Sequence, residues 1–501
     1  MSIGRSIVAN YASQLYASVL AILMVPLYVQ YMGIEAYGLV GFYAVLQGWF
    51  LILDMGLSAT LSREAARYNA GAVEGIDLRR LVRSFEGIFF TVGLCGAIGL
   101  IAASHLLASR WLHVEQLPLS EVQSAIGLMA VIVALRWITG LYRGIVMGME
   151  HIVWLSGCNT VVATFRFLLI VPYLAYVGAT PTHFFTYQLV IACGETLVLI
   201  AKTYRLLPTV TTRGWIRWQL QPLRGVARFT LTVAFTSMVW VIVTQADKLL
   251  LSGMIPLGDY ALYSMAVLLA GGIIMLSGPV TSAVLPRLTR LHAEGDDAAL
   301  RRLYRLATQI VGVIVIPVVL VLAFFPVAVV TAWTGQAEIA VRAAPVLTLY
   351  AIGNGILAFA SFSYLIQVAR GNLTLHVIGN LIFVAIFVPL LIFAVGRFGI
   401  VGAGWAWLLA NLVPFVVWLP IVHHRYLRGV HWGWLSRDIA APVVPATALA
   451  ALLAHGMAFG ESRFSILAQL GSVYALLVLT AACCSSEFVS ILRARTLVRA
   501  A

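Results

Sequence analysis

Leu257-Gly258-Asp259-Tyr260-Ala261-Leu262 opens the stretch that decides the fold. The chain then runs without a charged residue from Tyr260 to Leu285, passes Pro286-Arg287 and a polar loop, and continues as Leu-Arg-Arg-Leu-Tyr-Arg at 300–305 before a second apolar run. A run of roughly 18 or more apolar residues can cross the hydrocarbon core of a membrane as a helix. The stretch therefore predicts two membrane-spanning helices joined by a short basic loop.

The same order of features occurs once before. Gly-Ile-Glu-Ala-Tyr-Gly-Leu at 33–39 precedes an apolar run, Arg63, a polar loop and Leu-Arg-Arg-Leu-Val-Arg at 78–83. The offset is 223 residues from Tyr37 to Tyr260, 224 from Arg63 to Arg287 and 222 from Leu78 to Leu300. We interpret this as an internal duplication of about 220 residues. The alternative is a chance likeness between helix–loop–helix hairpins of similar composition.

The composition indicates a membrane protein throughout. Of the 501 residues, 61% are hydrophobic and 10% charged, and the mean hydropathy is +0.97. The net charge of +13 does not indicate nucleic-acid binding, because the basic residues lie in loops between apolar runs, which is a topology signal. The five cysteines lie inside apolar runs without the spacing of a metal or redox pair, so we predict neither disulfides nor a metal site.

We predict an all-α, polytopic fold with fourteen transmembrane helices. The spans are 7–32, 36–60, 85–109, 122–144, 152–177, 183–203, 228–253, 258–285, 306–333, 343–367, 374–395, 399–422, 439–459 and 464–488. An even number of spans per repeat makes the two halves parallel. Residues 1–203 and 228–422 would form six-helix bundles, and 423–501 would add two helices and a tail. The linker at 204–227 is either an amphipathic segment on the membrane surface or an ordinary solvated connection.

The distribution of Lys and Arg predicts the orientation. Of the 32 basic residues, 25 lie at loops and ends on one side of the predicted membrane, 4 on the other and 3 inside spans. Because cytoplasmic loops carry the excess of positive charge, we predict that both termini are cytoplasmic.

Several motifs resemble the polysaccharide-transport flippases, which belong with the MATE exporters and lipid II flippases to one superfamily. They are Gly33…Tyr37-Gly38 with Leu53-Asp54-Met55-Gly56-Leu57 and Arg63, then Asp247-Lys248 with Leu257-Gly258-Asp259-Tyr260 and Pro286-Arg287, then Asn380 and Gly399-Ile400-Val401-Gly402-Ala403-Gly404. The resemblance covers nearly the whole chain, and its strength lies in the order and spacing of the motifs.

The resemblance implies two six-helix bundles around a central cavity. It also implies alternating-access transport of undecaprenyl-pyrophosphate-linked oligosaccharide repeat units across the bacterial inner membrane, for O-antigen or exopolysaccharide synthesis. Implied partners are membrane lipids and the polysaccharide polymerase and chain-length proteins. The chain departs from cation-coupled MATE exporters, because its first span has no carboxylate, and from lipid II flippases, because no basic residue follows Arg5 before Arg63.

Charged residues inside the predicted spans suggest a substrate site. Arg136 and Arg143 are seven residues apart on one face of a helix, Arg166 lies about 21 Å into the fifth span, and Glu195 lies level with Arg136. Charges in a membrane are costly and face protein or water. Since the guanidinium fork matches phosphate oxygens, we expect Arg143, Arg136 and Arg166 to receive a pyrophosphate in turn, with Glu195 holding them when the site is empty. The alternative is that Arg136–Glu195 is a structural pair.

Other polar residues have weaker patterns. Asn10 and Gln14 share a face of the first span and could bind sugar hydroxyls or join helices. Asp54 could cap a helix, act as a gate or contact substrate. Asp247 and Lys248 could couple or gate transport, or Lys248 could snorkel to the interface. Arg63 and Arg287, at equivalent places in the repeat, are further candidates for gating.

Other functions are less consistent with the sequence. The two lysines, Lys202 and Lys248, each lack a preceding glycine, so the chain has no P-loop and we expect no nucleotide or other cofactor. An enzyme of the same pathway would place catalytic residues in a sizeable outer loop, and 110–121 is short, so we expect no enzymatic activity. A MATE-like, cation-coupled small-molecule exporter is the remaining alternative.

Overall fold

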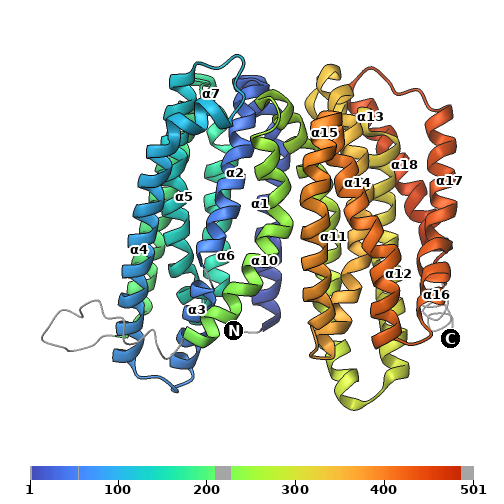
Figure 1. Cartoon of the computed structure of the whole chain (residues 1–501), viewed down its shortest axis with the longest axis horizontal. Helices are drawn as coiled ribbons and strands as arrows, with labels where there is room; N and C mark the ends of the chain where they lie inside the picture. The colour runs from blue at the N-terminus through green and yellow to red at the C-terminus, as the bar shows by residue number, and fades with distance from the viewer. Residues whose placement is uncertain (1–2, 55, 209–226, 487–501) are drawn as a thin grey trace, which may run out of the picture. The chain divides into compact units, whose positions relative to one another are not determined.

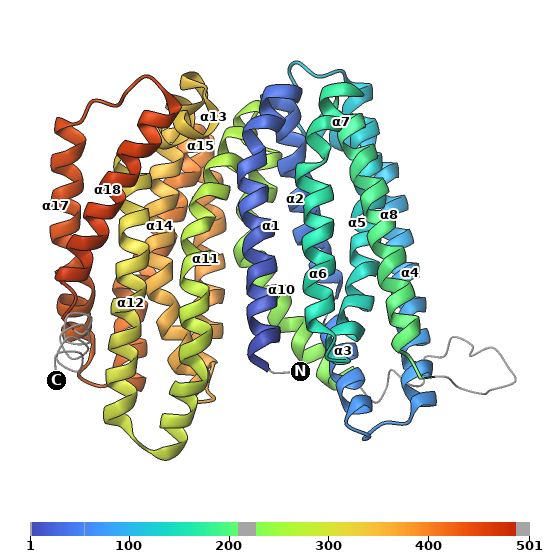
Figure 2. The same ribbon diagram turned by 180° about the vertical axis from the view of Figure 1, so that it is seen from behind.

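The computed structural model describes residues 3–54, 56–208 and 227–486. Over these residues the chain is helical, with one isolated β-bridge between His113 and Pro256, which confirms the predicted all-α class (Figures 1 and 2). Twelve helices in the described part are long and apolar enough to cross a membrane. Residues 209–226, where we expected the linker segment, lie outside the described residues.

The chain divides into two compact units, Met1–Ala261 and Leu262–Ala501. The helices of the first unit are α1 (Ile3–Met32), α2 (Ile34–Asp54), α3 (Leu57–Asn69), α4 (Gly75–Leu106), η1 (Leu107–Trp111), α5 (Leu119–Gly148), α6 (Ile152–Ala163), η2 (Thr164–Leu168), α7 (Ile170–Tyr176), α8 (Pro181–Leu206) and α10 (Ala227–Ser252). The η elements are π-helices. The repeat assigns α10 to the second half, yet α10 packs against α2 in the first unit.

The predicted span 36–60 is wrong at its end. The helix α2 ends at Asp54, and the shorter α3 starts at Leu57 after Gly56, which has φ of +70°. Glycine adopts this left-handed conformation without a steric penalty, so it permits the chain to change direction within a sequence that is apolar on both sides.

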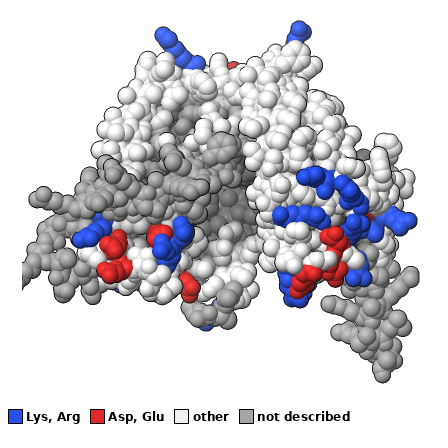
Figure 3. Space-filling view, turned by 60° about the horizontal axis from the view of Figure 1, so that its bottom comes forward, with Lys and Arg blue, Asp and Glu red and all other residues white. Residues whose placement is uncertain are grey.

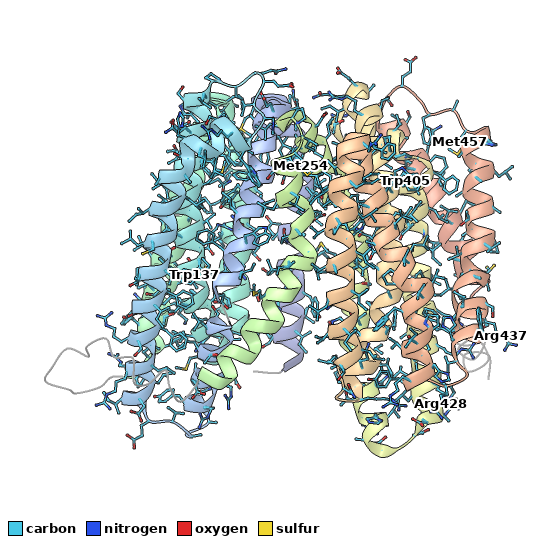
Figure 4. The ribbon with its side chains drawn as sticks, viewed as in Figure 1. Trp137, Met254, Trp405, Arg428, Arg437 and Met457 are labelled. Carbon is cyan, nitrogen blue, oxygen red and sulfur yellow. The ribbon has the colours of Figure 1, made fainter. Side chains whose placement is uncertain are left out.

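The core of the first unit lies where α3, α4, α5 and α8 meet. The rings of Phe89 and Trp137 stack with centroids 4.3 Å apart, and buried side chains such as Leu61, Leu141 and Leu199 surround them. Figure 4 shows Trp137 in this interior, and Met254 at the far end of the unit after α10. This packing holds α5 and α8 side by side.

The second unit contains most of α11 (Leu257–Glu294) and the remaining helices. These are α12 (Asp297–Phe324), α13 (Pro326–Thr334), α14 (Ala337–Ala369), α15 (Thr374–Tyr426), α16 (His431–Gly433), η3 (Trp434–Ala440, a π-helix), α17 (Ala441–Gly456) and α18 (Arg463–Cys483). In its core, Tyr350 stacks on Trp407 at 5.4 Å, and Asn354 donates to Ala270 O and accepts from Trp407 Nε1. The predicted span 306–333 is interrupted at Phe325, where α12 ends before Pro326.

The long helix α15 is a helical hairpin. Its backbone leaves helical geometry at Gly399, with φ of 56° and ψ of −139°. A Cβ on Gly379 would lie 2.7 Å from Trp418 Nε1, which shows that the segments before and after Gly399 run back along each other. The predicted boundary between spans 374–395 and 399–422 is thus close to the observed turn. The total of fourteen spans and the two-bundle arrangement stay predictions.

The repeat landmarks occupy equivalent places. Tyr37 is the fourth residue of α2 and Tyr260 the fourth of α11, while Leu78 and Leu300 are the fourth residues of α4 and α12. All four side chains are buried. This agreement is the geometry that an internal duplication would produce.

Lys and Arg side chains gather at one end of each unit, with a few at the other (Figure 3). In the second unit, Arg428 and Arg437 lie at the end that holds the α11–α12 turn (Figure 4). The grouping follows the census made from the sequence. Which end faces the cytoplasm stays a prediction.

Candidate functional site

Two arginines of α5 share one carboxylate of α8. Arg143 Nη2 donates a hydrogen bond to Glu195 Oε1, and Arg136 Nη2 lies 3.9 Å from Glu195 Oε2. Between the arginines, the Thr139 and Thr196 hydroxyls are 2.9 Å apart and buried, which fixes the register of the two helices. Glu195 is buried, whereas 20% of the Arg136 side chain and 34% of the Arg143 side chain are exposed. Both arginine side chains are therefore partly accessible, although Arg136 Nε is buried without a hydrogen-bond partner.

Arg166 completes the cluster from a break in the fifth span. It lies in η2, and its guanidinium carbon is 5.1 Å from the centroid of the Phe167 ring. The charges of Arg136 and Glu195 both act on it. Within the described residues no carboxylate lies within ion-pair distance of Arg166. We call Arg136, Arg143, Arg166 and Glu195 the arginine cluster.

The arginine cluster can bind an anion. Two guanidinium groups contact Glu195 and the charge of a third, Arg166, acts on it, so the four residues have a formal charge of +2 when all are ionised. Planar guanidinium donors match phosphate and carboxylate oxygens in pairs. The structure brings Arg136 and Arg143 to Glu195, and the hydrogen bond to Glu195 comes from Arg143, whereas we expected Glu195 to lie level with Arg136. Substrate binding by the cluster stays a prediction.

Two further side chains of the first unit could interact with an anion or with a reagent. The thiol of Cys158 on α6 is half-buried and within range of the charges of Arg143 and Glu195. Lys202 Nζ lies 5.1 Å from the centroid of the Trp154 ring. The sequence analysis used Lys202 for topology and to exclude a P-loop, and it considered Cys158 only together with the other cysteines, because neither residue belongs to a motif of a binding site.

The candidates from the first two predicted spans and the loop after them do not join the cluster. Gln14 Nε2 donates to Asn10 Oδ1 at 3.3 Å, within α1. Asp54, the last residue of α2, accepts at Oδ1 from Ser58 N at 3.3 Å and from Ser58 Oγ at 2.6 Å, so it binds the first turn of α3, whose N-cap residue is Gly56. Which of the three roles that the sequence left open Asp54 performs stays a prediction. Arg63, on α3, is half-exposed and lies 3.9 Å from Glu64.

The last three candidates lie on α10 and α11. Asp247 is buried, and Lys248 Nζ lies 3.9 Å from its Oδ1 and 2.5 Å from Thr244 O. Lys248 therefore bonds within its own helix. Arg287 is exposed on α11. The roles of these three residues in gating or coupling stay predictions.

Other buried charges are fully engaged by protein. Glu86 accepts hydrogen bonds from Arg83, Tyr142 and Tyr204 at 2.7, 3.1 and 2.8 Å. In the second unit, Asp438 accepts two bonds from Arg305 at 2.7 and 2.9 Å and one from Gln309 at 2.6 Å. Sequence reasoning missed the second network, because Asp438 follows Arg437 in an apparent loop. Over the described residues, no three His, Cys, Asp or Glu side chains are grouped so that they could hold a metal ion.

Comparison with known proteins gives one family and a set of similar folds. A family model described as polysaccharide biosynthesis protein matches residues 3–292. The solved lipid II flippase MurJ, in an inward closed conformation, is similar with a TM-score of 0.73 and 13% identity, covering 99% of this chain and 100% of that one. No curated protein matches the chain.

Multidrug transporters of the MATE family are also similar in fold. An inward-facing MATE transporter of the MOP superfamily has a TM-score of 0.65 and 13% identity, covering 82% of this chain and 94% of that one. The MATE multidrug transporter DinF-BH has a TM-score of 0.57 and 14% identity, covering 85% and 95%. At these identities the likeness establishes the fold alone.

Proposed function

Because this chain belongs to the polysaccharide biosynthesis protein family, we propose that it is a flippase for lipid-linked saccharides. Its substrate would be an oligosaccharide repeat unit joined through pyrophosphate to a polyprenyl lipid, undecaprenol in bacteria. The protein would move it by alternating access from the cytoplasmic to the outer leaflet of the inner membrane, for O-antigen or exopolysaccharide synthesis. The fold shared with the lipid II flippase MurJ is consistent with a lipid-linked cargo.

The observation that carries the proposal is the arginine cluster. One arginine is enough to neutralise Glu195, and the charges of two further arginines are left uncompensated, which is costly in a membrane interior. A pyrophosphate carries two or more negative charges and would neutralise the excess of two. Arg143, Arg136 and Arg166 would then hold the pyrophosphate while Glu195 releases them. The protein performs no covalent step in this scheme.

Reconstituted vesicles test the proposal. The protein would be placed in vesicles whose bilayer carries a pyrophosphate-linked polyprenyl saccharide, and the sugar in the outer leaflet would be measured with an impermeant lectin. We expect wild type to equilibrate the sugar between leaflets and Arg136→Gln and Arg166→Gln to do so at least about tenfold more slowly, because each loses a charged phosphate contact. Arg110→Gln, outside the cluster, is the matched control.

The MATE-like exporter is the alternative outcome. The described residues of α1 contain no Asp or Glu, which speaks against cation coupling through that helix. If vesicles took up a cationic dye along an ion gradient and left the lipid-linked saccharide in place, the flippase proposal would be wrong.

A further inference from the structure

The backbone that carries Arg166 is held by side chains from two other helices. In η2, Leu169 N donates to Thr164 O at 3.1 Å, a bond that spans five residues. In an α-helix the same N–H would bond to Phe165 O. Pro172, which follows within the same span, has no N–H to donate to a carbonyl group of the preceding turn. The π-helix thus leaves carbonyl groups around Arg166 in need of donors.

Three consecutive carbonyl groups receive such donors. Phe165 O accepts from Tyr187 Oη at 2.8 Å, Arg166 O from Gln188 Nε2 at 3.0 Å and Phe167 O from Tyr28 Oη at 2.7 Å. Tyr28 comes from α1, and Tyr187 and Gln188 from α8, the helix that also carries Glu195. Tyr28 and Gln188 are buried. The peptide unit of Arg166 is therefore fixed relative to the helix that carries the carboxylate of the cluster.

We infer that Tyr28, Tyr187 and Gln188 are positioning residues that hold η2 open so that Arg166 reaches the anion in the arginine cluster. The inference rests on the proposed function. A regular α-helix through 164–168 would rotate the residues that follow relative to those that precede, and would carry Arg166 out of register with Arg136 and Glu195. Without the three donors the π-helix loses the interactions that satisfy its free carbonyl groups.

A native thiol allows the test. Cys158 on α6 is half-buried and within range of the charges of Arg143 and Glu195, so an anion bound at these residues should shield it from an impermeant maleimide. In full-length protein in nanodiscs, with the other four cysteines replaced by Ala, the labelling rate of Cys158 would be measured against inorganic pyrophosphate concentration. Tyr28→Phe and Tyr187→Phe, each alone, would be compared with Tyr16→Phe. Tyr16 is also on α1 and contacts η2, but its hydroxyl lies 2.8 Å from the Thr164 side chain and not from a carbonyl group.

A double-mutant cycle with Arg166→Gln separates positioning from general stability. We expect Tyr28→Phe and Tyr187→Phe each to weaken pyrophosphate protection about threefold or more when Arg166 is present, and not to weaken it further in the Arg166→Gln background. Tyr16→Phe should match wild type. Two results would overturn the inference and leave the proposed function intact. In the first, the tyrosine substitutions weaken pyrophosphate protection equally with and without Arg166. In the second, the tyrosine variants match the Tyr16→Phe control while Arg166→Gln is impaired. If pyrophosphate did not protect Cys158 of the wild-type protein from labelling, the anion site itself would be refuted.

Discussion

Arg143 of α5 donates a hydrogen bond to the carboxylate of Glu195 of α8, a residue that is 6% exposed. The second oxygen of Glu195 lies 3.9 Å from Arg136. One carboxylate therefore neutralises part of the charge of two arginines. The charge of a third arginine, Arg166 in η2, also acts on Glu195. The relationship makes Glu195 a competitor of any anion that enters the cluster.

Replacing Glu195 by Gln should tighten anion binding and slow transport. The substitution removes a negative charge near the bound phosphate, and at ~8 Å and an effective dielectric constant of ~20 this repulsion is on the order of 2 kcal/mol, more than tenfold in affinity. Pyrophosphate protection of Cys158 measures the affinity and the lectin assay the transport rate. Arg143→Gln should change the affinity in the opposite direction. Weaker protection in Glu195→Gln would mean that the carboxylate only holds the arginines in place.

Glu35 should be important for stability, although it lies in the motif that marks the repeat. Its carboxylate accepts bonds from the backbone N–H groups of Glu115, Gln116 and Leu117 at 2.6, 2.9 and 2.9 Å. Loss of a hydrogen bond to a charged group costs about 1.5–3 kcal/mol, so Glu35→Ala should lower the melting temperature in detergent by several degrees. Glu115→Ala, an exposed side chain of the same loop, is the control. Equal melting temperatures for the two variants would contradict the prediction.

The sequence could predict the helices of this fold better than their interruptions. Apolar runs and the repeated Tyr and Leu landmarks locate helix starts, because membrane length and helical pitch determine them. The break at Gly56 and the π-helix at Arg166 depend on single residues inside apolar runs, where composition does not change. A proline such as Pro172 indicates a kink, but the donors that stabilise it come from distant helices.

The arginine cluster could be predicted in part, because helical pitch determines which residues share a face of a helix. Spacing along α5 puts Arg136 and Arg143 on one face, since seven residues make nearly two turns. Which of the two arginines donates the hydrogen bond to Glu195 depends on how their long side chains extend along the helix. Depth estimates made from span ends do not resolve this. The pair Arg305–Asp438 joins two segments far apart in the sequence and required the structure.

Arg305→Ala should destabilise the second unit. Arg305 makes two hydrogen bonds to Asp438, which has no exposed surface. Removing one partner of a buried pair leaves the other charge uncompensated and costs about 3–5 kcal/mol; the partial exposure of Arg305 favours the lower value. Thermal unfolding monitored by intrinsic tryptophan fluorescence would measure the loss. Arg437→Ala removes the exposed neighbouring charge and should have little effect on stability (Figure 4). A comparable loss of stability in both variants would show that the Arg305–Asp438 pair is not stabilising.

Gly148 should not tolerate even a methyl group. Gly140, Gly144 and Gly148 recur every four residues on α5, a spacing of small residues that permits close helix packing in membranes. A Cβ on Gly148 would lie 2.2 Å from Ser62 O and 2.8 Å from Ala65 Cβ of α3, both of which resist displacement. A Cβ on Gly140 would meet only the Ser58 hydroxyl, at 3.3 Å, which can rotate away. We therefore expect Gly148→Ala to separate α3 from α5 and to cost about 1–3 kcal/mol by overpacking, with Gly140→Ala close to neutral, as thermal unfolding in detergent would show. Because α3 would pack less closely on α5, Gly148→Ala should also increase proteolysis at the α3–α4 turn. A Gly148→Ala variant as stable as Gly140→Ala would show that α3 does not pack as closely on α5 as the backbone distances indicate.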